Sequence, residues 1–236
     1  MSEIWKATKI TANAASKMQT DAGLLLNSFN IAAPTEPADS AIVCDTTGDI
    51  TITCKPTTKD FFENVNNAPE GTKEGLRITG WSDCTIGLTC ISATADTIKT
   101  GLGAAEVDSD GGISPRTQYK LTDFKTYYWI GDMIDEDKLL CVKIDNAVSS
   151  EGISLTLTKN DKGTISITLK GYTSTSDINK VPMTFYLLTK VGEYDSTKTY
   201  ALNDLCTHSG SLYKCTTAIA TPEEWNSEHW TAVTNS

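Results

Sequence analysis

The sequence of 236 residues predicts a mainly β fold. Apolar and polar residues alternate over residues 152–158 and 164–170, and a period of two is the pattern of half-buried antiparallel strands. Turn formers and Ser/Thr residues are plentiful between such short stretches, which favours an all-β chain. The hydrophobic fraction of 39% is enough for a core, and the charged fraction of 21% does not indicate disorder. The length suits one large β domain with a small appendage.

The strongest expected element is a hairpin formed by these two alternating stretches. Residues 160–163, Asn-Asp-Lys-Gly, suit a type I turn ending in a left-handed residue, which the final glycine tolerates. This loop would set Leu157 opposite Ile167 and Leu155 opposite Leu169, so that the apolar faces coincide. The other face would carry small, neutral, hydrophilic side chains: Ser154, Thr156, Thr158, Ser166 and Thr168.

Four ordered motifs in the middle of the chain carry a resemblance to a known family. They are Trp-Ile-Gly-Asp from Trp129, the run from Lys143 to Gly152, the Asn-Asp-Lys-Gly turn, and Val-Pro-Met from Val181. In this order and spacing they resemble the major tail protein (tail tube protein) of long-tailed bacteriophages, best over residues 50–188. The resemblance implies a β-sandwich subunit, spanning residues 39–189, that assembles into hexameric rings. The rings would stack into the tube through which viral DNA leaves the head.

The resemblance also implies partners and a place. The partners would be copies of the same chain, other phage tail proteins, and DNA that passes through without specific binding. The protein would be part of the virion tail and be assembled in the cytoplasm of the host bacterium. That family has no catalytic residues or cofactors to carry over, so the protein is expected not to be an enzyme.

The Ser/Thr face of the hairpin has two interpretations. It is either an ordinary solvent-facing strand surface or, as the resemblance implies, the lining of the channel. Strands joined across six subunits would also remove the unpaired edges that an open sheet exposes.

The net charge of −10 argues against a nucleic-acid-binding protein, because binding phosphates needs a basic stripe. Residues 190–236 carry three lysines and six acidic residues, so the acidity is spread along the chain and is not one tail. An acidic wall that repels DNA suits a conduit. Mild acidity is also common in soluble proteins.

The start of the chain and its cysteines predict folding in a reducing compartment. Met-Ser-Glu-Ile has neither the basic region nor the apolar core of a signal peptide. The longest apolar run is too short to span a bilayer, so no membrane insertion is expected. The seven cysteines are odd in number and widely spread, without a Cys-x-x-Cys pair.

The first third of the chain predicts an arm, a hairpin and a helix. Residues 1–38 are either an arm that docks on a neighbouring subunit or a frayed helix with an edge strand. Residues 41–54 predict a hairpin that sets Cys44 opposite Ile50 and Ile42 opposite Ile52, so that Cys44 and Cys54 are small apolar residues and not a disulfide. A capping box at Thr57 and Asp60 predicts a short helix that packs Phe61, Phe62 and Val65 and ends over residues 66–71.

The middle of the chain predicts one strand, a long connection and a core strand. Residues 80–91 alternate, with Cys84, Ile86, Leu88 and Cys90 on one face. Residues 92–112 would form a connection with a short helix at 95–102 and an exposed turn at 108–112. Tyr127 and Trp129 share one side of a strand, as core or ring-contact residues.

Residues 190–236 form a separate aromatic pattern that predicts a small β module. A two-residue turn at Ser209-Gly210 would make a hairpin, and strands would surround aromatics that begin at Tyr194. The pattern is similar to the small carbohydrate-binding module of chitinases and cellulases, although Gly-Glu-Tyr stands where that family often has paired tryptophans. The candidate glycan contacts are Tyr213, Trp225 and Trp230, of which two are expected to be buried. The rival function is therefore a glycan-binding adhesin that forms no tube.

No motif in the sequence predicts a catalytic or metal site. His208 and His229 are expected to be solvated, and the phosphate-loop, dinucleotide and zinc-protease motifs are missing. Asp108 to Gly111 resembles part of a calcium loop, but Thr117 stands where the bidentate Glu is required. An acidic turn is the preferred interpretation.

Overall fold

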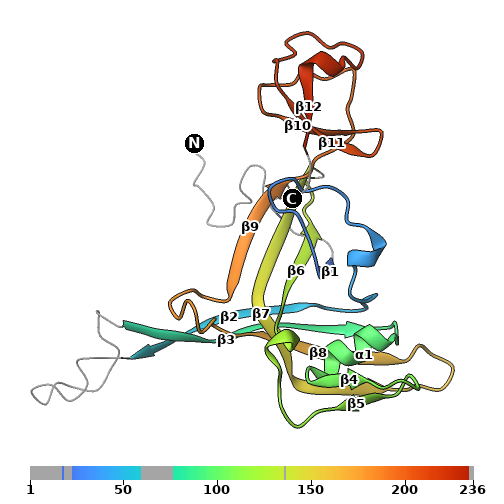
Figure 1. The fold of residues 1–236 in the computed structure, drawn as a ribbon, viewed down its shortest axis with the longest axis vertical. Coiled ribbons are helices and arrows are strands. Elements are labelled where there is room, and N and C mark those ends of the chain that lie inside the picture. Colours follow the sequence, from blue (N-terminus) through green and yellow to red (C-terminus); the bar gives the residue numbers. More distant parts are fainter. Residues whose placement is uncertain (1–17, 19–22, 60–76, 136, 234–236) are drawn as a thin grey trace, which may run out of the picture.

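The computed structural model describes residues 18, 23–59, 77–135 and 137–233. It confirms the mainly β fold: a curled antiparallel sheet forms most of the molecule, and a small three-stranded sheet follows near the C-terminus (Figure 1). The large sheet has the strand order β1-β6-β7-β8-β3-β2, and β9 also pairs with β7. Its strands are β1 (Leu24–Leu26), β2 (Thr51–Lys59), β3 (Arg77–Cys90), β6 (Lys125–Asp132), β7 (Lys138–Thr156), β8 (Thr164–Gly171) and β9 (Met183–Thr189).

Strand β7 organises the large sheet because its two halves have different neighbours. Residues 138–144 pair with β9 and residues 139–147 pair with β6, whereas residues 147–156 pair with β8. Asn146 has a positive φ of 48° where the two halves meet. In Figure 1 the first half of β7 stands upright with β6 and β9, and the second half lies with β8, β3 and β2. The expected sandwich is therefore built from one continuous sheet that bends over a single core.

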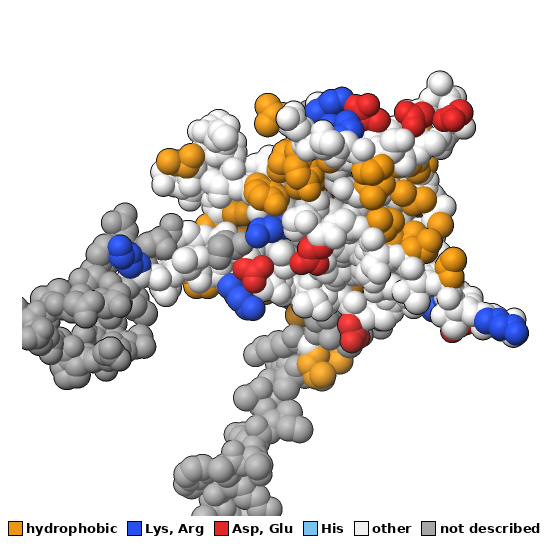
Figure 2. Space-filling model, turned by 90° about the horizontal axis from the view of Figure 1, so that it is seen from below, with side chains coloured by type: hydrophobic (Ala, Val, Ile, Leu, Met, Phe, Trp, Pro, Cys, Tyr) orange, Lys and Arg blue, Asp and Glu red, His pale blue; other side chains and the backbone are white. Residues whose placement is uncertain are grey.

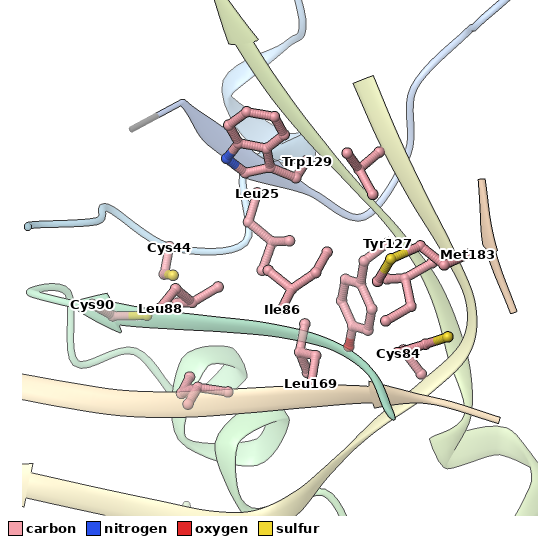
Figure 3. Packing of buried hydrophobic residues seen from close by; sticks show 14 of the residues in the cluster. Leu25, Cys44, Cys84, Ile86, Leu88, Cys90, Tyr127, Trp129, Leu169 and Met183 are labelled. Atoms are coloured by element: carbon pink, nitrogen blue, oxygen red, sulfur yellow. The ribbon is translucent and has the colours of Figure 1, made fainter. Parts of the chain in front are cut away.

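The core lies between the two halves of this bent sheet. The predicted face of β3 is confirmed, and its side chains point toward Leu25, Tyr127 and Trp129 of the opposite half (Figure 3). Tyr127 and Trp129 are core residues, which was one of the two roles expected for them. Other buried members of the core include Val142, Ile144, Ile165, Ile167 and Leu169.

Helix α1 (Ala95–Leu102) forms where the sequence predicts it. Thr94 caps its start, since the Thr94 Oγ1 accepts a hydrogen bond from Thr97 N at 3.1 Å. The helix ends at Gly103, whose φ is +73°. Strands β4 (Ala105–Val107) and β5 (Ile113–Pro115) then pair, and the turn of residues 108–112 between them is exposed, as expected.

The predicted hairpin of residues 41–54 is wrong. Ile42 forms an antiparallel bridge with Leu26, and Val43 N donates to Leu25 O at 2.9 Å, so residues 42–43 lie beside β1. Strand β2 pairs with β3, which brings Ile52 opposite Ile86. The long β3 offers more partners than a local hairpin, and this tertiary pairing overrides the local turn signal.

The β7–β8 hairpin forms, but its predicted register is wrong. Leu155 lies opposite Ile165, four residues from the expected Leu169. The turn lies earlier in the sequence than predicted, because Asp161 N donates to Thr158 O. The residue with positive φ is Asn160 and not Gly163. Because the shift is even, the apolar and hydroxyl faces keep their composition.

Two further expectations fall partly outside the described residues. Thr58 and Lys59 belong to β2, so the start of the predicted helix is wrong, and its body at residues 60–71 lies outside the described residues. Of the first 22 residues only Met18 is described. Within the predicted segment of residues 1–38, residues 24–26 form the short edge strand β1, paired with β6.

The C-terminal module is a small β module, as predicted, and has three strands: β10 (Leu205–His208), β11 (Ser211–Cys215) and β12 (Trp230–Ala232). The two-residue turn is confirmed: Ser209 and Gly210 both have positive φ and join β10 to β11. The remaining short elements are 3-10 helices, η2 (Asp39–Ala41), η4 (Leu121–Asp123) and η5 (Ser227–His229).

Candidate functional site

The predicted Ser/Thr face of the β7–β8 hairpin points away from the core. Ser154, Thr156 and Ser166 are exposed and Thr168 is half-buried. The residues between them on β8, Ile165, Ile167 and Leu169, are buried. Thr158 is exposed beyond the end of β7.

This hydroxyl surface extends over two strands that the sequence analysis did not include. Ser154 lies opposite Ser166, which lies opposite Thr89 of β3. In the next row Thr168 lies opposite Gly87, which lies opposite Thr51 of β2. We call this four-stranded surface the hydroxyl face: Thr51, Thr53, Thr85, Thr89, Ser154, Thr156, Thr164, Ser166 and Thr168.

The sequence contains a signal for the added residues. Thr51 and Thr53 alternate with Ile52 and Cys54, and Thr85 and Thr89 alternate with the buried face of β3. The wrong hairpin assignment for residues 41–54 hid the pairing of β2 with β3. Without that pairing, the two threonine rows could not be joined to the β7–β8 hairpin.

The apolar face of the same hairpin is only partly covered. Near the bend, α1 packs on it, and a Cβ on Gly101 would lie 3.3 Å from Ile167 and 3.4 Å from Ile153. Farther out, Leu155 and Leu157 are 58% and 77% exposed. Hydrophobic side chains gather in patches on the side of the molecule seen in Figure 2.

Strand β9 exposes a second apolar site. Phe185 and Leu187 lie opposite Val142 and Leu140, on the face of the sheet that carries the core. They are nevertheless 52% and 73% exposed. In the part of the chain that the structure describes, β9 pairs only with β7, so its other edge has no strand beside it. We call Leu155, Leu157, Phe185 and Leu187 the apolar rim.

The aromatic residues of the C-terminal module pack on one another. Trp225 stacks on Trp230 with ring centroids 5.4 Å apart, and on His208 at 4.0 Å. Tyr194 stacks on Tyr200 at 5.2 Å, and its hydroxyl donates to Glu223 O at 2.9 Å. These rings, with Cys206, Cys215 and Ile219, form a core separate from that of the large sheet.

The three candidate glycan contacts therefore lie in different surroundings. Trp230 is only 6% exposed and belongs to the module core. Trp225 is half-buried between parallel rings, which occupy ring faces that a sugar would need. Tyr213 is half-buried and packs edge-on against Trp225 at 4.9 Å.

The prediction that both histidines are simply solvated is wrong. His208 is half-buried on Trp225, and His229 Nδ1 lies 2.6 Å from Glu223 Oε1. Glu193 lines the same corner, since its carboxylate accepts from Thr207 Oγ1 and from Ser209 N. These contacts hold the β10–β11 turn against the start of the module.

The acidic turn of residues 108–112 uses its carboxylates internally. Asp108 Oδ2 accepts from Ser114 Oγ at 2.9 Å, and Asp110 Oδ1 accepts from Gly112 N at 3.0 Å. Among the described residues no group of three or more His, Cys, Asp or Glu side chains is arranged to hold a metal ion. The acidic-turn interpretation accounts for these contacts.

A cleft of about 920 Å³ lies between the loop of residues 27–41 and the C-terminal module. Small and amide side chains such as Asn27, Asn30 and Asn203 line it, together with Tyr128. The lining also includes one acidic side chain, Glu36, and one basic side chain, Lys214.

Comparisons with protein-family models, with curated proteins and with solved structures gave no match to this chain. No helix among the described residues is long and apolar enough to cross a membrane.

Proposed function

We propose that this protein is a structural subunit of a phage tail tube, which assembles into hexameric rings that stack around a DNA channel. The observation that carries the proposal is the combination, on one bent sheet, of a broad hydroxyl face and an exposed apolar rim. The role involves no catalytic step and no cofactor. The motifs that resemble the tail tube family lie on β6, β7, the β7–β8 turn and β9.

The apolar rim supports self-association. Its four side chains are large, apolar and exposed to water. Covering them with a second surface is favourable by about 25 cal/mol per Å² of apolar area removed from water. Two side chains of the apolar rim lie on the β7–β8 hairpin and two lie on β9, and these are different parts of the sheet. A contact that joins two different surfaces is heterologous, and such contacts close into rings or extend as filaments.

The hydroxyl face supports the conduit. Its Ser and Thr side chains are small and uncharged, so they offer DNA phosphates no ionic partner, whereas Lys170 lies at the margin of the face, opposite Thr85. The net charge of −10 adds a repulsive field around the chain. A wall of this kind lets DNA pass without holding it.

The rival adhesin function has less support. Its aromatic candidates are engaged with one another in the module, with Trp230 buried and Trp225 stacked. We propose instead that the module is a compact decoration on the outside of the tube.

Light scattering across a concentration series tests self-association. The unchanged chain should increase in mass with concentration, whereas Leu157→Asp and Leu187→Lys should shift association to at least tenfold higher concentration. Leu202→Lys is the matched control, because Leu202 is 58% exposed on the module and outside the apolar rim. Equal association of all four proteins would contradict the assignment of the apolar rim.

A further inference from the structure

Two cysteines face each other across β2 and β3. Cys54 and Cys84 are direct partners in the antiparallel ladder, and their Sγ atoms lie 3.6 Å apart. Directly opposite residues in such a ladder have Cα atoms about 4.5–5.5 Å apart, within the roughly 4.4–6.8 Å that a disulfide spans. Rotation of the two side chains is therefore enough to bring the sulfurs to bonding distance.

We propose that Cys54 and Cys84 form a redox modification site, at which a small-molecule disulfide such as oxidised glutathione converts the two thiols into a disulfide between β2 and β3. The thiolate of Cys54 attacks one glutathione sulfur, forms a mixed disulfide and releases one glutathione. The thiolate of Cys84 then attacks the Cys54 sulfur and releases the second glutathione. Two protein thiols are oxidised, one glutathione disulfide is reduced, and the two protons pass to the released glutathiones.

Burial assigns the order of these two steps. Cys54 is half-buried on β2 and is the thiol that a reagent in solution reaches, whereas Cys84 is buried in the core. Burial, followed by the hydrogen bond with Cys54, raises the pKa of Cys84 to about 12. Burial and protonation make Cys84 a poor nucleophile toward a reagent in solution, but its deprotonated form needs no access to solvent to attack a sulfur that already touches it.

The other cysteines explain why this pair reacts first. Cys44 and Cys90 also lie near each other, but both are buried (Figure 3). Cys141 is buried, and so are Cys206 and Cys215 in the separate module core. Cys54 is thus the only cysteine of the seven that is not buried, and all seven lie in the described part of the chain.

The position of the pair determines the effect of the disulfide. The β2–β3 ladder is regular from Thr51 to Lys55, and its register shifts between Lys55 and Thr57. A disulfide at Cys54 would fasten an outer strand of the sheet next to this irregularity. Oxidation should therefore slow hydrogen exchange in β2, because local opening of that strand would require the crosslinked pair to separate.

The experiment treats the folded full chain with oxidised glutathione, traps remaining thiols by alkylation and maps the peptides by mass spectrometry. The expected result is a Cys54–Cys84 crosslinked peptide that forms before any other, with slower hydrogen exchange in β2. Cys54→Ala should abolish the crosslink, and Cys141→Ala should retain it as the matched single-thiol control. If the Cys141 variant does not fold, the peptide map of the unchanged chain decides alone.

Two results would overturn the proposal. One is a Cys54 that accumulates as a stable mixed disulfide with glutathione while Cys84 still alkylates after unfolding. The other is a crosslink that forms first between a different pair of cysteines. Both readouts are independent of tube assembly, so they do not depend on the proposed function.

Discussion

Asp145 is a single residue that stabilises the bend of β7. Its carboxylate lies 2.9 Å from Lys143 Nζ and 3.0 Å from Lys180 Nζ, and it accepts a hydrogen bond from Thr126 Oγ1. Burial raises the pKa of this carboxyl, but the hydrogen bonds from Lys143 and Lys180 outweigh it, so the pKa is lowered overall. The backbone of Asp145 also donates to Pro182 O at 2.7 Å, which ties the bend to the segment before β9.

We expect Asp145→Asn to lower the free energy of unfolding by about 2 kcal/mol, because charge-assisted hydrogen bonds at a mostly buried site are lost. The Asp145 contribution is present above the unfolded pKa of about 4, and it is lost as pH falls through the lower folded pKa. Urea unfolding at neutral and acidic pH measures this difference. Asp132→Asn is the control, since the Asp132–Lys190 pair at 3.0 Å is exposed and should change stability by less than about 1 kcal/mol. Equal effects of the two variants at neutral pH would contradict a structural role for Asp145.

Gly103 shows how one element is attached to the next. It ends α1 with a φ of +73°, and a Cβ there would lie 2.5 Å from Ser149 O of β7. Glycine is needed here both for the left-handed backbone and for the close approach of the helix end to β7.

We therefore expect Gly103→Ala to destabilise the protein more than Gly48→Ala does. Gly48 also has a positive φ, of +71°, but a Cβ added there would meet no neighbouring atom. Alanine at this position should therefore cost only the backbone strain, about 1 kcal/mol. The clash at Gly103 should add to that strain and shift the urea midpoint further. Identical midpoints for the two variants would show that α1 can move away from β7 at no cost.

Local elements were predictable where the sequence pattern and the final neighbours agree. Helix α1, the alternation of β3 and the Ser209-Gly210 turn depend on residues close in sequence, and each was predicted. The hairpin of residues 41–54 was wrong because its turn signal competes with the distant strand β3. The register of β7–β8 was wrong by an even number because alternation defines the faces but not the loop length.

The candidate surfaces were predicted in part for the same reason. Alternation identified four of the five predicted hydroxyl residues correctly as a face directed away from the core, and the fifth, Thr158, lies beyond the end of β7. Long-range pairing was needed to extend that face to β2 and β3. The apolar rim could not be predicted, because alternation marks Leu155 and Leu157 as core and only the position of α1 shows that they stay uncovered.

At the scale of the whole molecule, the two sheets have separate cores. The module core contains Trp230, and the core of the large sheet includes none of the module residues. We expect Trp230→Ala to cost about 3–5 kcal/mol within the module and to increase hydrogen exchange in β10 to β12. Amides of β7 and β8 should keep their protection, because their packing is unchanged. Equal loss of protection in both sheets would contradict the division at residue 190.

The central claim is that the bent sheet is a ring-forming unit, and negative-stain electron microscopy of the purified full chain tests it most directly. Images at low and high protein concentration should show stacked rings or hollow tubes at the high concentration, with the Leu187→Lys variant remaining as small particles. A uniform field of small particles at every concentration, identical for the unchanged chain and the variant, would contradict the tube assignment.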